Sequence, residues 1–150
     1  MRREPTETPL PDPVAEARRY VQNAKDVLRN NTTVDPETQC YSDSKYVRMA
    51  GNTLWNGILL LLDALFQVKA SSDSRPDIRD YRQAIAIRDK KLLTLVDSGY
   101  DTLHLAMGYD GNPRKAVCDD GFQLANQIIE RCEKMLPLSY HLENKSLLQK

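Results

Sequence analysis

Apolar residues recur every three or four positions along four long stretches of the chain, which is the period of an α-helix with one buried face. The first stretch begins at Asp12-Pro13, because aspartate suits the N-cap and proline suits the first helical position. It ends near residue 30. The other stretches cover about residues 42–69, 77–97 and 113–136, and a shorter segment at 98–109 opens with a capping-box-like spacing of Ser98 and Asp101.

This pattern predicts an all-α fold, an antiparallel bundle of four main helices plus a short helical segment. Helices joined by short or medium loops favour antiparallel neighbours, and no stretch combines a period of two with hairpin turns. The second helix is expected to be the central axis because its second half is apolar on several sides. We expect a flexible arm at 1–11, which holds three prolines, a bundle domain at 12–137 and a C-terminal tail at 138–150.

Charge and hydropathy argue against nucleic-acid-binding and membrane proteins. The 21 lysines and arginines balance 21 aspartates and glutamates, so net charge favours neither nucleic acid nor an anionic membrane as a partner. The longest apolar run extends only from Ile58 to Leu62, well short of the roughly 18 residues that span a bilayer. The N-terminus also lacks the apolar region of a signal peptide. We therefore expect a cytoplasmic protein with no membrane contact.

Cysteine and histidine usage predicts no metal and no cofactor. The three cysteines are odd in number and widely spaced, without a CxxC pair, so neither a disulfide framework nor a zinc site is indicated. Cys118 and Cys132 lie among apolar residues and are predicted to be core thiols. The chain has two histidines, far apart, and no GxGxxG or Walker-type pattern.

A polar row on the second predicted helix is the most informative anomaly. Arg48, Asn52, Asn56 and Asp63 follow one another at spacings of four, four and seven, so they share one face. The row is interpreted either as a binding groove or as the solvated side of an amphipathic helix, and the solvated side is favoured. Asp63 lies near apolar neighbours, and a desolvated carboxylate needs a partner.

Arg88 is a candidate partner, since it interrupts an apolar row on the third predicted helix. We expect it to form a structural bridge to Asp63 or to Asp101, with binding of an anion or a nucleotide phosphate as the alternative.

A second polar constellation comprises Tyr100, Asp101 and His104 in the segment 98–109. On an α-helix Asp101 and His104 are neighbours, so the carboxylate could orient the imidazole for acid–base work. A lone histidine beside an aspartate at this spacing is more often structural, and no nucleophile motif accompanies it.

From Tyr46 to Glu130 the chain resembles an uncharacterised bacterial family of small helical proteins, on YVRMAGNTLWNGILLLLDALF and LVDSGYDTLHLAMGYDGN. More distantly the bundle resembles the HEPN superfamily, some of whose members cleave RNA or partner nucleotidyltransferases. In the RNA-cleaving members an arginine precedes a histidine by four to six residues. No arginine precedes either histidine at that spacing here, so the resemblance implies a non-catalytic branch.

These observations favour a non-enzymatic helical-bundle interaction module that binds a protein partner or self-associates. The alternative is a HEPN-like domain that binds a small ligand or a nucleotide, as part of a toxin–antitoxin or nucleotidyltransferase system. A HEPN-like nuclease that uses Tyr100, Asp101 and His104 is the third hypothesis.

Overall fold

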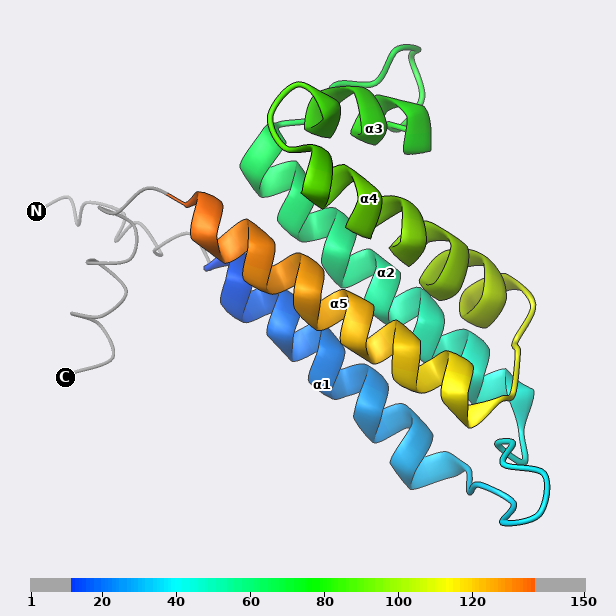
Figure 1. Ribbon diagram of the computed structural model, residues 1–150. Helices are drawn as coiled ribbons and strands as arrows, with labels where there is room; N and C mark the ends of the chain where they lie inside the picture. Colours follow the sequence, from blue (N-terminus) through cyan, green and yellow to red (C-terminus); the bar gives the residue numbers. More distant parts are fainter. Residues whose placement is uncertain (1–11, 137–150) are drawn as a thin grey trace, which may run out of the picture.

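The computed structural model describes residues 12–136, and every regular element among them is a helix (Figure 1). The predicted all-α bundle is therefore confirmed. The predicted arm at 1–11 and tail at 138–150 lie outside the described residues. In chain order the elements are α1 (Pro13–Asn31), α2 (Ser44–Phe66), α3 (Ile78–Ala86), α4 (Lys90–Gly99), the π-helix η1 (Tyr100–Tyr109) and α5 (Lys115–Met135).

Aspartate side chains start four of these helices by accepting hydrogen bonds from amides that have no partner inside the helix. Asp12 accepts from the amide of Val14 at 2.9 Å, and Asp43 from that of Lys45 at 3.0 Å. Asp77 forms a capping box with Asp80 at the start of α3, and Asp89 caps α4. At the other end of α2, Gln67 takes a left-handed conformation with φ 48°, which stops the helix.

The third predicted helix is wrong in its boundaries. The helix is broken at residues 87–89 into α3 and α4, and the predicted short segment at 98–109 continues α4 without a break as η1. The break follows from Asp89, whose side chain accepts from the amides of Lys91 and Leu92 and so starts a new helix. The bundle has four long helical rods, as predicted, but its short element is α3.

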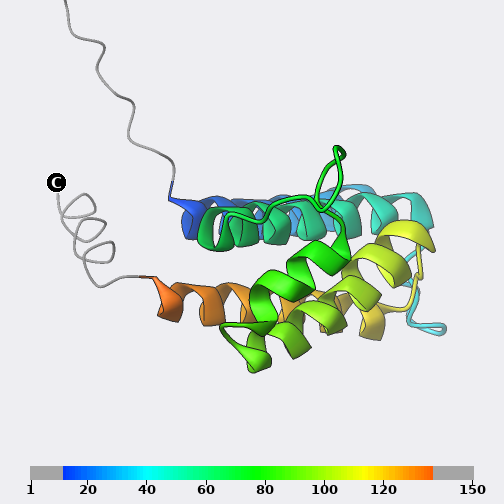
Figure 2. The same cartoon turned by 90° about the horizontal axis from the view of Figure 1, so that it is seen from above.

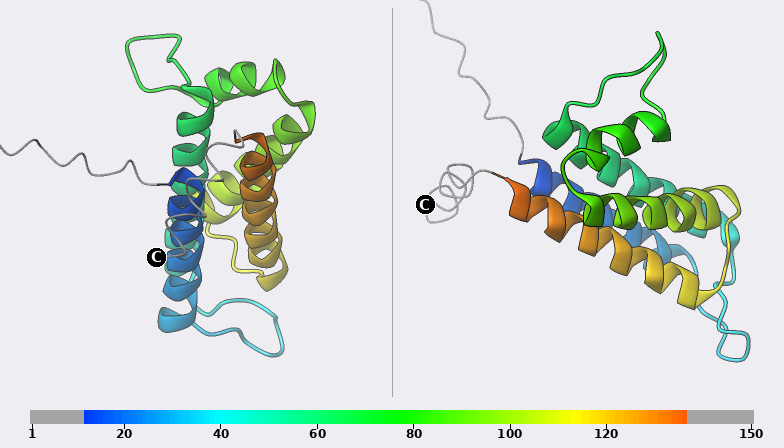
Figure 3. Two further views of the ribbon diagram at one scale, coloured as in Figure 1. Left: turned by 90° about the vertical axis from the view of Figure 1, so that its left-hand side faces the viewer. Right: turned by 45° about the horizontal axis from the view of Figure 1, so that its top comes forward.

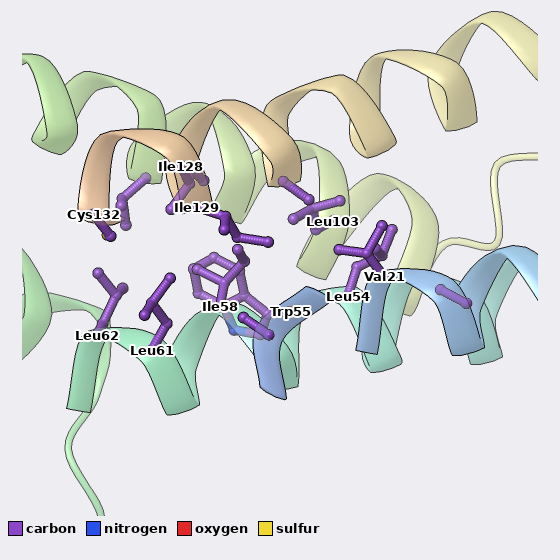
Figure 4. Packing of buried hydrophobic residues seen from close by; sticks show 14 of the residues in the cluster. Val21, Leu54, Trp55, Ile58, Leu61, Leu62, Leu103, Ile128, Ile129 and Cys132 are labelled. Carbon is purple, nitrogen blue, oxygen red and sulfur yellow. The ribbon is translucent and has the colours of Figure 1, made fainter. Parts of the chain in front are cut away.

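The four long rods form two layers, in which consecutive rods run antiparallel. Figure 2 shows α1 and α2 in one layer and α4–η1 with α5 in the other, while α3 runs obliquely from the layer of α2 to that of α4. Buried side chains of α1 and α2, among them Val21, Leu54 and Ile58, meet Leu103 of η1 and Ile128 of α5 between the layers (Figure 4). The links at 32–43 and 67–77 lie at opposite ends (Figure 3).

Helix α2 is the central element, because it contacts α1, η1, α5 and α3. Nine of its residues are buried, including Leu61 and Leu62. By length and composition alone α2 could also cross a membrane, with a mean hydropathy of 1.3 over its most apolar window. The core helix of a soluble protein meets the same criterion. The expectation of a protein without membrane contact therefore stays a prediction.

The two thiols predicted for the core are buried there. Burial raises the pKa of Cys118 to about 11 and that of Cys132 to about 12, so neither supplies thiolate near neutral pH. Cys40 is partly exposed. We expect iodoacetamide at pH 8 to alkylate Cys40 alone in the folded protein, as measured by mass spectrometry, and Cys40→Ser to abolish that labelling. Alkylation of Cys118 or Cys132 before denaturant is added would contradict this prediction.

Candidate functional site

Two adjoining cavities open along α2 where the link 67–77 and α3 pass over it. We call them together the α2–α3 groove. The larger cavity, of about 460 Å³, is lined by Tyr20, Asn56, Leu59, Leu60, Asp63, Arg75, Pro76 and Tyr81. The smaller, of about 280 Å³, is lined by Trp55, Leu59, Pro76, Asp77, Ile78, Tyr81, Tyr100 and His104. The cavities share three lining residues, so they form one surface feature whose walls come from distant parts of the sequence.

The groove brings together four of the eight residues predicted from sequence. Asn56 and Asp63 line its larger cavity, and Tyr100 and His104 line its smaller one. The other four, Arg48, Asn52, Arg88 and Asp101, line neither. The two polar constellations, which are separate in the sequence, therefore meet in one place, but each contributes only part of its members.

Asp63 pairs with a tyrosine and not with an arginine. The Tyr81 hydroxyl of α3 donates to Asp63 Oδ1 at 2.7 Å, and among the described residues no other partner of this carboxylate occurs. Burial raises the pKa of Tyr81, and the carboxylate raises it further, so the phenol stays protonated and able to donate. The predicted bridge from Arg88 to Asp63 or Asp101 is therefore wrong.

The helix break after α3 explains where Arg88 goes. It lies in the turn between α3 and α4, is exposed, and stands over the ring of Phe66 with 5.6 Å between the guanidinium carbon and the ring centroid. A continuous helix would have kept Arg88 in the row of Tyr81 and Ile85. The turn removes it from that row.

An aromatic cluster forms the inner wall of the smaller cavity. The His104 ring centroid lies 5.1 Å from that of Tyr100 and 6.0 Å from that of Trp55, and Trp55 and Tyr100 meet edge to face at 5.8 Å. Arg82 lies over the Tyr100 ring at 5.8 Å while its Nε donates to Asp97 at 2.6 Å. The pair of Arg82 and Asp97 therefore helps to hold the ring of Tyr100 in place.

The pairing of Asp101 with His104 that their spacing on an α-helix would allow does not form. Asp101 is exposed, and no hydrogen bond or ion pair joins it to His104 in the described part of the chain. The π-helix gives the reason, because its turns are wider than those of an α-helix. Residues four apart, such as Tyr100 and His104, then lie almost one full turn apart and share a face of the helix. Residues three apart, such as Asp101 and His104, point in different directions. The imidazole consequently packs on rings instead of facing a carboxylate.

The first half of the predicted polar row is structural. Arg48 Nε donates to the carbonyl oxygen of Tyr109 at 3.3 Å and Nη2 to that of Asp110 at 3.5 Å, so the guanidinium binds the free carbonyls that end η1. Asn52 packs on Gly108 so closely that a Cβ there would meet its side-chain oxygen. The row thus divides into a network at Arg48 and Asn52 and a groove wall at Asn56 and Asp63.

Sequence reasoning missed the residues that complete the groove. Trp55 and Tyr81 read as apolar positions of their helices, although the polar tip of a buried tyrosine signals a hydrogen-bond partner. Arg75 and Pro76 belong to a link whose path over α2 no local pattern encodes. Within residues 12–136, no cluster of three or more histidines, cysteines or carboxylates could hold a metal ion.

Comparison with known proteins agrees with this fold. The model of the DUF5618 family, a domain of unknown function, matches residues 12–134. A protein of unknown function from Dyadobacter fermentans is similar in structure, with a TM-score of 0.73 and 42% sequence identity over 83% of this chain and 96% of that one. No curated protein matches the chain. The HEPN resemblance stays a prediction. The chain belongs to the DUF5618 family.

Proposed function

We propose that this chain is a non-enzymatic interaction module that binds a protein partner through the α2–α3 groove. The observation that carries the proposal is the groove's composition, since tyrosine, tryptophan and arginine are the side chains that dominate binding energy at protein interfaces. Here Tyr20, Tyr81 and Tyr100 line it together with Trp55 and Arg75. These side chains come from four helices and a link, a scaffold that holds them in fixed positions.

The openness of the groove favours a polypeptide over a small molecule. Asn56, Leu60, Asp63 and Arg75 are each exposed on its walls, whereas a small-molecule site encloses most of its ligand. A small-ligand site remains the second candidate, because a cavity of about 460 Å³ is large enough for one. The contacts of His104 support a binding role over acid–base catalysis, since its ring lies on Trp55 and Tyr100 and, within residues 12–136, forms no hydrogen bond or ion pair with a carboxylate.

A pair of matched variants tests the groove. Leu60→Arg fills the larger cavity from a residue that is 44% exposed, and Ile87→Arg makes the same change at a residue that is 87% exposed and lies outside both cavities. Immobilised wild-type protein and both variants are incubated with lysate of the source organism, and retained proteins are identified by mass spectrometry. We expect a protein that the wild type and Ile87→Arg retain and Leu60→Arg does not.

The candidate is then purified and its affinity for the three forms is measured by calorimetry, with folding checked by circular dichroism. Light scattering measures the oligomeric state of the three forms. If the partner is a second copy of this chain, the wild type and Ile87→Arg are expected to be oligomers and Leu60→Arg a monomer. A wild-type chain that is monomeric and retains the same proteins as Leu60→Arg would refute the proposed function.

A further inference from the structure

The α2–α3 groove has an acidic group at one end and an aromatic wall at the other, and this polarity restricts what can cover it. Asp63 lies in the larger cavity beside Leu59, Leu60 and the ring of Tyr20. Trp55 and His104 lie in the smaller cavity. Resting on the proposed function, we infer that the partner is a polypeptide segment that places a lysine or arginine side chain against Asp63 and a large apolar side chain into the cavity beside Trp55.

The requirement for a cation follows from the hydrogen bonding of Asp63. Tyr81 donates one hydrogen bond to Oδ1 of Asp63. No other group in the described residues donates to this carboxylate, so its second oxygen depends on solvent for hydrogen bonds. A segment that covers the groove removes that water, and a desolvated carboxylate with one donor is strongly unfavourable unless the partner supplies a charge-assisted bond. An uncharged segment therefore binds more weakly than a basic one, and an acidic segment binds most weakly.

Arg75 is the other charged group on the larger cavity, and it forms no ion pair with Asp63. It belongs to the link 67–77 and is exposed, so its long side chain can stay hydrated at the rim. Asp77, on the smaller cavity, is already occupied with the first amides of α3 and with Arg79. Asp63 is thus the group whose charge the partner must match.

The helix also sets the spacing of the two anchors. Asp63 follows Trp55 by eight positions on α2, which corresponds to about 12 Å along the helix axis. An extended segment covers that distance with roughly four residues. The segment we infer has an apolar side chain and a basic side chain three or four positions apart.

Three capped peptides test the inference: acetyl-Phe-Ser-Ser-Ser-Lys-amide and its counterparts with Ala or Glu in place of Lys. Trp55 is the chain's only tryptophan, so its fluorescence reports binding in the smaller cavity, and nitrogen–proton correlation spectra locate contacts along the groove. We expect the order Lys, then Ala, then Glu in affinity, with Lys roughly tenfold tighter than Ala. In Asp63→Asn this order is expected to collapse, while Asp101→Asn, at an exposed aspartate outside both cavities, preserves it.

The outcomes separate this inference from the proposed function. Equal affinities of the three peptides, binding that Asp63→Asn leaves unchanged, or no binding by any of them would overturn the requirement for a basic segment. The proposed function would still stand if Leu60→Arg loses a partner that Ile87→Arg retains. Loss of that distinction would remove the proposed function itself.

Discussion

Leu61→Ala is expected to lower the free energy of unfolding by about 2–5 kcal/mol. Leu61 is fully buried on α2, and Figure 4 shows it pointing from that helix toward the layer that holds α5. Alanine removes the buried methyl groups from a position that neighbours on both layers surround, so a cavity remains where the side chain was. Because α2 contacts every other long rod of the bundle, those neighbours cannot move in to fill it without losing contacts elsewhere.

The adjacent residue supplies the matched control. Leu60 is 44% exposed on the same helix, so Leu60→Ala makes the same chemical change and is expected to cost less than about 1 kcal/mol. Urea unfolding followed by circular dichroism measures both, with equal m-values required for the comparison. Similar losses in the two variants would mean that Leu61 is not in the core of the folded protein.

The contrast between buried Leu61 and exposed Leu60 also explains why the helices could be predicted from the sequence. Leu61 lies in the apolar row of the second predicted helix, and the row at three- and four-residue spacing fixes which face is buried. Local capping groups such as Asp12 and Asp43 then fix where helices start. Both signals lie within a few residues of the feature they determine.

The break between α3 and α4 could not be predicted from the spacing of apolar residues. The apolar row continues through Ile85 and Leu92, so periodicity alone predicts one helix, and Asp89 competes with it by capping α4. Arg131 of α5 also binds Asp89, at 2.8 Å and 3.2 Å, and lowers the pKa of its carboxyl group. This contact joins residues 42 positions apart, so no local pattern predicts it, and the cap at Asp89 is the local signal for the break.

The candidate site was predictable only residue by residue. Asn56, Asp63, Tyr100 and His104 stand out in the sequence because they are polar in mainly apolar helices. Their assembly depends on the crossing of α2 with η1 and on the path of the link 67–77, which are tertiary features. The π-helical winding that turns Asp101 away from His104 likewise has no signature in the pattern of apolar residues.

The crossing of α2 with η1 leads to the second large effect. Gly51 of α2 faces η1 so closely that a Cβ built on it would lie 2.6 Å from the amide nitrogen of Gly108 and 2.8 Å from the carbonyl oxygen of Leu103. Both are backbone atoms, which cannot rotate away as a side chain can. Gly51→Ala must therefore separate two helices in the centre of the bundle, on which the wall of the smaller cavity also depends.

We expect Gly51→Ala to lower the free energy of unfolding by about 1–3 kcal/mol through this overpacking. The sign of this change in unfolding free energy is informative, because alanine in a helix interior otherwise stabilises by about 1 kcal/mol relative to glycine. Gly99→Ala is the matched control, since its nearest neighbour outside its own helix is the end of the flexible Ile128 side chain at 3.0 Å. That variant is expected to stay within about 1 kcal/mol of the wild type, because Ile128 can change rotamer.

Urea unfolding measures the stability of both glycine variants, and the fluorescence of Trp55 reports whether the cavity wall has moved. If Gly51→Ala were as stable as Gly99→Ala and left the Trp55 emission unchanged, α2 and η1 could not cross in contact at this glycine. The groove built on that crossing would then need a different geometry.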